Sequence, residues 1–455
     1  MSVGVDVQLQ CCETERAGDS RLRVRRNFAL GVISGVAYNI NASLLSTQLV
    51  MTWFVSELTE SNLLISLLVP IEIGTWYLLQ PFLSPYVRRR SRALPLYRAM
   101  AVIRVGALAL LSLALAFLGP QASLLSAFMV LFTVYCVAAG TAALPFLSVV
   151  AKTIPPERRG RYFGWRRFAG GLLAMGGAVL VKIVLSPDSA LDFPANYALL
   201  FAGGCLVTLV MVVTFCLVEE PSGPAEPDES VAVEPFRRRL GRALQDGNYA
   251  RYLGLRVALA VASWALPFYA VYARRELGVS GDVVGTYVMA STAAAIVSNL
   301  ALGWIGDRHG NRLLVRLAAL TALLPPAAVL LSVWLTGPAL EQSALFTSVF
   351  VFQGLHNTAQ SIGSSNYLLE LGSASQRITY VSAAHGLIGL ALLGSPLGGA
   401  MVDRMGFDIL FAVSLVSALV AVVLSTGLRE PREGLDASHK RSGRAATDVG
   451  WYEGG

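Results

Sequence analysis

The sequence predicts an all-α protein that crosses a membrane twelve times, as two bundles of six helices. Of its 455 residues, 55% are hydrophobic and 14% are charged, whereas an ordinary soluble domain has about 25% charged residues. The apolar residues gather in runs of about 20 residues, the length that a helix needs to cross a bilayer. A mean hydropathy of +0.58 fits many such spans. This composition excludes a soluble enzyme and a disordered scaffold.

Twelve apolar runs can be placed along the chain, six on each side of one long polar stretch. We expect the spans near 28–55, 62–86, 94–118, 122–150, 162–186, 196–218, 250–273, 282–305, 312–335, 342–370, 378–402 and 407–428. The domains then follow as an N-tail at 1–26, a first bundle at 27–218, a linker at 219–248, a second bundle at 249–428 and a C-tail at 429–455.

Basic residues lie mostly on one side of these spans. The tails, the linker and alternate loops carry 29 Lys and Arg residues, and the opposite loops carry only Arg274, Arg275 and Arg404. Because basic loops stay in the cytoplasm, we expect both termini to be cytoplasmic, in the inner membrane of a bacterium. Residues 1–26 contain no cleavable secretory signal, so the first span is expected to be retained.

The linker is acidic and proline-containing over residues 219–234, which predicts disorder. Phe236, Leu240, Ala243 and Leu244 then share one face of a helix beside several arginines. This amphipathic segment is expected either to lie on the anionic inner leaflet or to serve as a simple tether.

The two halves show a weak internal repeat. A shift of 218 residues aligns Tyr162 with Tyr380 and Gly171 with Gly389, each pair after the fourth span of its half. Such a repeat indicates a duplicated six-span unit.

A tight turn is predicted between spans eight and nine, where the segment GWIGDRHGNR lies. Its glycine and charged residues are Gly303, Gly306, Asp307, Arg308, Gly310 and Arg312. We expect the first two glycines to allow close helix approach and the last to form the turn. The aspartate can accept hydrogen bonds from backbone amides at the start of a helix, and the arginines can pair with acidic or carbonyl groups.

This segment resembles the G-x-x-x-D-R-x-G-R signature of the major facilitator superfamily, in the loop where the second copy belongs. With twelve spans and a long central loop, the resemblance covers about residues 27–428. It implies a secondary transporter that works by alternating access, with the signature as a conformational gate. The first-half copy, PFLSPYVRRRSR, lacks both the acidic residue and the glycine. GAMVDRMG, at 399–406, is similar in pattern, but we expect only a turn there.

Ionisable residues inside spans are costly and therefore candidate functional groups. Glu72 and Arg104 lie at similar depths on the adjacent spans two and three. We expect them to pair, either as a protonation switch that couples transport to an ion gradient or as a static structural pair.

Three spans carry candidate substrate-binding faces. In a major facilitator, spans one, four, seven and ten line the central cavity. The candidates are Tyr38, Asn41 and Gln48 on span one, Trp264, Phe268 and Tyr272 on span seven, and Gln353, His356, Asn357 and Gln360 on span ten. The polar faces could equally join helices to one another, and the aromatic stripe could equally serve packing.

These residues predict a carrier of a small, neutral or weakly charged organic solute, with protons or sodium as candidate coupling ions. A non-transporting membrane protein on the same scaffold, such as an assembly factor or a sensor, is the alternative. Enzymatic activity is not expected, because clustered catalytic groups and a P-loop are missing from the sequence. We expect contacts with membrane lipid, a monomer, no cofactor or metal, and no nucleic-acid partner.

Overall fold

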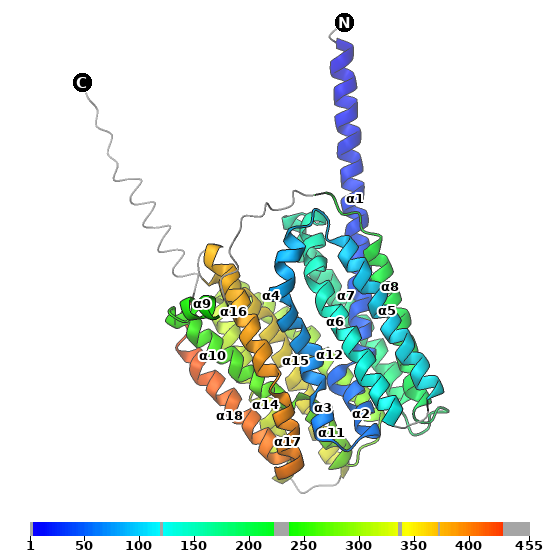
Figure 1. The fold of residues 1–455 in the computed structure, drawn as a ribbon, viewed down its shortest axis with the longest axis vertical. Helices are drawn as coiled ribbons and strands as arrows, with labels where there is room; N and C mark the ends of the chain where they lie inside the picture. The colour runs from blue at the N-terminus through cyan, green and yellow to red at the C-terminus, as the bar shows by residue number, and fades with distance from the viewer. Residues whose placement is uncertain (1–2, 119–121, 223–235, 335–338, 372–373, 431–455) are drawn as a thin grey trace, which may run out of the picture.

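The computed structural model describes residues 3–118, 122–222, 236–334, 339–371 and 374–430. The regular structure within these ranges is helical, and the helices form two bundles that lie side by side (Figure 1). The predicted all-α architecture is confirmed.

The first bundle contains six spans, two of which are built from consecutive shorter helices. The first comprises α1 (Val3–Leu44), η1 (Thr47–Met51) and α2 (Thr52–Leu58), and the second comprises α3 (Asn62–Ser66), η2 (Pro70–Gly74) and α4 (Thr75–Arg88). The other four are α5 (Leu94–Phe117), α6 (Ala122–Thr153), α7 (Pro156–Val184) and α8 (Ala195–Cys216).

The second bundle repeats this plan after the linker helix α9 (Phe236–Ala243). Its first span comprises α10 (Gly247–Ala262), η3 (Ser263–Ala265) and α11 (Leu266–Arg275), and its second is α12 (Asp282–His309). The rest are α13 (Asn311–Thr321) with α14 (Leu324–Trp334), α15 (Ala339–Glu370), α16 (Ala374–Leu392) with α17 (Ser395–Met405), and α18 (Phe407–Thr426).

Eleven of these spans are long and apolar enough to cross a membrane, counted over the described residues. The twelfth, α15, is 32 residues long, but polar side chains along one face lower its hydropathy. Its length and its place between α14 and α16 make it a span as well. The chain is therefore the predicted twelve-helix, multi-pass membrane protein.

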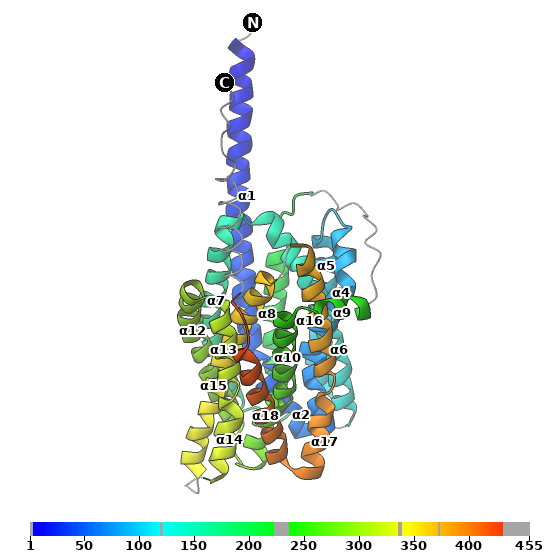
Figure 2. The ribbon, with the colours of Figure 1, turned by 90° about the vertical axis from the view of Figure 1, so that its left-hand side faces the viewer.

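The segments outside the bundles were only partly anticipated. α1 begins at Val3 and continues without a break into the first span, so the N-tail is helical and projects beyond the bundle (Figures 1 and 2). The predicted amphipathic helix is α9, and its Leu240 and Ala243 pack against the core of the second bundle next to α16. This contact favours the tether over a helix lying on lipid. Linker residues 223–235 and the C-tail from 431 lie outside the described residues.

The internal repeat corresponds to similar packing in the two bundles. Tyr162 on α7 packs edge-on against Phe28 of α1, with ring centroids 5.6 Å apart. Tyr380 on α16 stacks on Tyr249 of α10, with centroids 4.1 Å apart. In each half, the fifth span thus holds the first span near the same face of the protein. This face contains the α6–α7 and α12–α13 turns, and we call it the inner face because the charge pattern predicts it to be cytoplasmic.

The apolar core differs between the two ends of the molecule. At the outer end, one cluster of buried side chains runs through both bundles and joins Phe54 and Phe128 to Phe268 and Phe346. Toward the inner face, one cluster lies within the first bundle and another mainly within the second. The bundles therefore share one core at the outer end, whereas toward the inner face each has its own core and the bundles meet through α7 with α12 and α4 with α16.

Candidate functional site

A cavity of about 620 Å³ lies between the two bundles, midway along the helices. Its wall comes from α1, α4, α5, α6 and α7 of the first bundle and from α12 and α15 of the second. A second cavity, of about 410 Å³, lies between α7, α12 and α15 and shares Arg167 and Asn299 with the first. The two cavities adjoin at these residues, and the second extends to Gly306 and Asp307 near the inner face.

Two π-helical turns face this central cavity. η1 supplies Thr47 and Gln48 to the wall, and η2 supplies Glu72. η2 begins at Pro70, which has no backbone N–H to donate, so the regular hydrogen bonding of the helix shifts there. Because π-helical turns occur frequently at functional sites, their position supports the cavity as the site.

Glu72 and Arg104 both line the central cavity, but they do not pair with each other. The Arg104 guanidinium donates a 2.8 Å hydrogen bond to the Tyr135 hydroxyl and lies over the same aromatic ring. Glu72 forms no ion pair within the described residues. The predicted pair is therefore wrong, because Tyr135 of span four reaches the guanidinium and engages it with both its hydroxyl and its ring. A coupling role for either residue stays a prediction.

The three polar residues predicted on span one all lie at the cavity wall. Tyr38 is 51% exposed, and it borders the cavity. Asn41 is buried, donates to the Tyr135 hydroxyl at 3.0 Å and accepts from the Thr208 hydroxyl at 3.0 Å. Gln48 lies where the central cavity meets a smaller one of about 100 Å³. Asn41 thus holds Tyr135 in place, while the other two are available to a solute.

The polar face of α15 borders the smaller cavity. Gln353, His356, Asn357 and Gln360 line it, and Asn357 also borders the central cavity. Gln353 donates to the Asn357 side chain at 3.0 Å, and His356 Nδ1 lies 3.0 Å from the Ala318 carbonyl oxygen. This face therefore points into the protein and toward the two cavities.

The smaller cavity also contains an arginine that the sequence analysis missed. Arg256 on α10 is only 5% exposed and lines this cavity. Its guanidinium donates to the Ser364 hydroxyl of α15 at 2.8 Å and to the Tyr77 hydroxyl of α4 at 2.9 Å. An arginine inside an apolar run is itself a functional signal. Its closeness to the basic inner end of the span hid it.

The aromatic stripe predicted on span seven does not border any of these cavities. Phe268 and Tyr272 belong to the outer apolar core, where Tyr272 stacks on Phe346 with centroids 5.8 Å apart. The Trp264 indole donates to the Ala391 carbonyl oxygen at 3.0 Å. The stripe lies on one face as expected, but that face packs against neighbouring helices. The structure therefore supports packing, the second of the two interpretations.

The signature turn joins α12 to α13 at the inner face. Gly310 ends α12 with φ +83° and ψ 168°, a conformation that is essentially restricted to glycine. The Glu430 carboxylate accepts a hydrogen bond of 3.0 Å from the backbone amide of Arg312 and so caps the start of α13. Arg308 lies over the Trp304 ring, 5.4 Å from its centroid. The first bundle has a similar cap, in which Glu220 accepts from the amides at the start of α5.

The remaining signature residues border the second cavity. Gly306 allows the expected close approach, because a Cβ there would lie 2.7 Å from the Leu314 side chain. At Gly303 a Cβ would meet nothing within 4 Å, and the residue borders the second cavity. The prediction that this glycine allows close helix approach is therefore wrong. Asp307 also borders the cavity and has no hydrogen bond or ion pair in the described part of the chain. Its predicted capping of backbone amides is therefore not seen.

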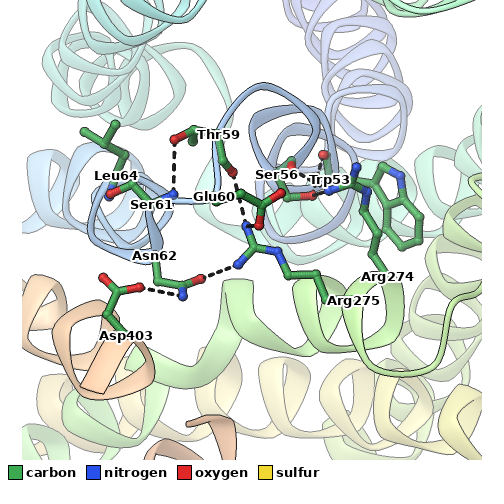
Figure 3. A network of polar contacts seen from close by, with 10 residues as sticks. All are labelled: Trp53, Ser56, Thr59, Glu60, Ser61, Asn62, Leu64, Arg274, Arg275 and Asp403. Carbon is green, nitrogen blue, oxygen red and sulfur yellow. Dashed lines mark hydrogen bonds and ion pairs between the residues drawn. The ribbon is translucent and has the colours of Figure 1, made fainter. Parts of the chain in front are cut away.

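At the outer face, polar side chains from both bundles form one network (Figure 3). Arg275 of α11 donates to the Asn62 side chain at 3.0 Å and to the Thr59 carbonyl oxygen at 3.1 Å. It also forms an ion pair with Glu60 at 3.0 Å. All three of these partners belong to the first bundle, at the connection between α2 and α3.

Two further contacts extend this outer network. Arg274 donates to the Ser56 carbonyl oxygen, and Asn62 donates to the Asp403 carboxylate of α17 at 2.7 Å. Figure 3 shows both arginines reaching from α11 toward the connection between α2 and α3. With the shared apolar core, the network closes the outer end of the central cavity.

Comparisons with known proteins agree with this architecture. Residues 252–451 match the Major Facilitator Superfamily, and no curated protein matches the sequence. The structure is similar to the D-xylose-proton symporter, with a TM-score of 0.66 at 16% identity, covering 90% of this chain and 98% of that one. It is also similar to a variant of the nucleoside transporter NupG, with a TM-score of 0.65 at 13% identity, covering 88% of this chain and 98% of that one.

A third similar structure has been solved in two conformations. A bacterial homologue of the iron transporter ferroportin gives a TM-score of 0.63 in its inward-facing state, at 12% identity and covering 89% of this chain and 98% of that one. Its outward-facing state gives 0.55 at 15% identity, with the same coverage of the two chains. The inward-facing form is the more similar, in agreement with the closed outer end. The second half of the chain thus matches the Major Facilitator Superfamily, and the chain as a whole shares the fold of these transporters.

Proposed function

We propose that the protein is a secondary transporter that moves a small, neutral or weakly charged organic solute by alternating access. The observation that carries this proposal is the cavity of about 620 Å³ between the bundles, which is adjoined on its inner side by a second cavity and closed at its outer end. In a duplicated six-helix architecture, rocking of the halves around such a site exposes it to each side in turn.

The solute contacts that we propose come from the polar side chains of spans one and ten. Tyr38, Gln48, Gln353, Asn357 and Gln360 border the central or the smaller cavity. Replacing one of the amides with Ala is expected to weaken binding by about 0.5–1.5 kcal/mol, the net value of a hydrogen bond. Trp264, Phe268 and Tyr272 are left out of this set because they are packed away from the cavities.

Coupling to protons would require a group that gains and loses a proton as the cavity changes sides. Glu72 is the carboxylate at the cavity wall. If transport is coupled to protons, we expect Glu72→Gln to abolish the accumulation of solute against a gradient but to preserve solute exchange across the membrane. Glu157→Gln, at the exposed inner end of α7, is the control variant. If Glu72→Gln still concentrates solute with unchanged pH dependence, Glu72 is not the coupling group.

Alternating access can be tested before the solute is known. In a background without the five native cysteines, spin labels at Leu63→Cys and Met405→Cys report the outer end, and labels at Arg161→Cys and His309→Cys report the inner end. Pulsed electron spin resonance in liposomes is expected to show two populations whose outer and inner distances change in opposite directions. A single population that does not respond to any solute mixture would favour the alternative, a non-transporting protein on this scaffold.

The solute can be sought with the same reconstituted protein. Proteoliposomes are incubated with a metabolite extract, washed, and their contents compared by mass spectrometry with those of protein-free liposomes. We expect at least one organic solute to be retained and to exchange with its external pool. Retention equal to that of empty liposomes for every solute would contradict transport.

A further inference from the structure

We infer that the solute carries an anionic group, which Arg104 of the first bundle and Arg256 of the second recognise together. This inference rests on the proposed transport function and adds the charge class of the solute. It starts from two permanent positive charges at the cavities that have no carboxylate partner.

Arg256 is a buried cation whose partners are both uncharged. Its guanidinium has five N–H donors, and it donates to the hydroxyls of Ser364 and Tyr77. Its Nε is buried and has no hydrogen-bond partner. Arginine remains protonated in proteins, so this position holds a full positive charge with donor capacity to spare.

Arg104 repeats this arrangement in the other bundle. Its guanidinium donates to the Tyr135 hydroxyl and lies over that neutral ring. Its Nε is likewise buried and without a partner. Tyr135 is held in place by Asn41, so the position of the guanidinium is set by the first bundle itself.

The charges at the cavities do not balance. Glu72 is the only carboxylate among the described residues that line the central and the smaller cavity. A carboxyl group can become neutral by binding a proton, whereas the guanidinium groups cannot. Arg167, where the central cavity adjoins the second one, adds a third cation, and it donates to the neutral Asn299 side chain. An unpaired charge in a membrane span is costly, and an anionic solute would supply the missing partner.

A solute could contact both arginines, because the two cavities are adjacent. The central cavity is lined by Arg104 and the smaller one by Arg256, and both are lined by Gln48 and Asn357. An anion between them would join the two bundles through a shared charge. Carboxylate and phosphate groups are the anions that guanidinium binds best, through paired hydrogen bonds.

The test uses purified full-length protein in detergent and matched pairs of small molecules at constant ionic strength. The pairs are acetate and acetamide, succinate and succinamide, benzoate and benzamide, and glucose 6-phosphate and glucose. Binding to the folded state raises the melting temperature. We expect at least one anion to stabilise the protein and its neutral partner to have no effect. Arg104→Gln and Arg256→Gln should each weaken the affinity for that anion by about 10- to 100-fold, as expected for a hydrogen bond to a charged group.

Three variants separate recognition from structural support. Tyr77→Phe removes the hydrogen bond between Tyr77 and Arg256 but leaves the charge, so the preference for the anion should persist. Arg256→Lys keeps the charge and should retain part of the affinity, and it also serves if Arg256→Gln does not fold. Arg251→Gln removes an exposed cation from the same helix and should leave anion binding unchanged.

Several results would overturn the inference. These are stabilisation by a neutral member equal to that by its anion, anion affinity that survives both Gln variants, and a panel in which no anion stabilises the protein. Transport itself is judged separately, by the spin-label distances and the proteoliposome contents. A neutral solute that is carried by a protein with normal conformational exchange would leave the transport function intact and refute the anionic solute.

Discussion

Two turns at opposite faces of the second bundle share one sequence pattern and one backbone conformation. GWIGDRHG at 303–310 joins α12 to α13 at the inner face, and GAMVDRMG at 399–406 joins α17 to α18 at the outer face. Gly310 has φ +83° and ψ 168°, and Gly406 has φ +87° and ψ 173°. The sequence predicts only a turn at the outer segment, and the structure has a turn there.

The surroundings of the two turns differ. Asp403 at the outer face accepts a hydrogen bond from Asn62 of the first bundle, whereas Asp307 at the inner face has no partner among the described residues. A Cβ at Gly399 would overlap the backbone of Asn62, but one at Gly303 would meet nothing within 4 Å. The aspartate and the first glycine of the pattern thus contact the other bundle at the outer turn, whereas their counterparts at the inner turn border a cavity.

The largest expected effect comes from filling the close contact at the outer turn. Gly399→Ala places a methyl group against the Asn62 backbone, and overpacking costs about 1–3 kcal/mol. The outer face should therefore open, and the ratio of the outer-open to the outer-closed population should rise by about 5- to 150-fold. The distance between labels at Leu63→Cys and Met405→Cys reports this ratio. Gly303→Ala is the matched control and should leave the inner-open population in place. Equal shifts for both variants would show that the two turns are not in different states.

The next effect tests the shared backbone conformation. Gly310→Ala imposes a side chain on a conformation that costs about 1–3 kcal/mol for other residues, and its Cβ would lie 2.7 Å from the Glu430 carboxylate. Gly406→Ala bears the same strain but meets nothing within 4 Å. Both should lower the melting temperature, Gly310→Ala more than Gly406→Ala. An unchanged melting temperature for both would contradict the strain.

A smaller effect is expected from the outer network. Arg275→Ala removes two hydrogen bonds and an ion pair with Glu60, whose side chain is 83% exposed. Because the ion pair is exposed, we expect little from it. The loss of the two hydrogen bonds should destabilise the closed outer face by about 1–2 kcal/mol. The outer label distance reports this loss. Arg404→Ala, which removes an exposed cation from the outer turn, should have no such effect.

The smallest equilibrium effect is expected at Asp307. Since its carboxylate has no partner in this conformation, Asp307→Asn should change the stability of the inner-open form by less than about 0.5 kcal/mol. We expect slower transport with nearly unchanged solute affinity, because the residue acts when the inner face closes. Equilibrium binding and initial transport rates, measured on the same preparation, distinguish slower transport from weaker binding. A large loss of affinity with unchanged conformational populations would contradict a gating role.

The sequence was informative wherever a property depends on one segment. Hydropathy located eleven of the spans, and the polar face that lowers the hydropathy of α15 indicated which of its sides points inward. The prediction that Glu72 and Arg104 pair failed because it used depth alone, and depth does not say that Tyr135 of a third helix stands closer. Arg256 was overlooked because it lies close to the basic inner end of its span, and only the packed bundles bring it to Tyr77 and Ser364.

By itself, the sequence determined the twelve spans, the two halves and the glycine turns, because hydropathy and backbone conformation act over a few adjacent residues. The tertiary structure decided which aspartate finds a partner, which aromatic face is packed away, and that two arginines face cavities without a carboxylate partner. These outcomes depend on the rotation and tilt of helices that are far apart in the chain. They arise from packing between the bundles, which no single segment encodes.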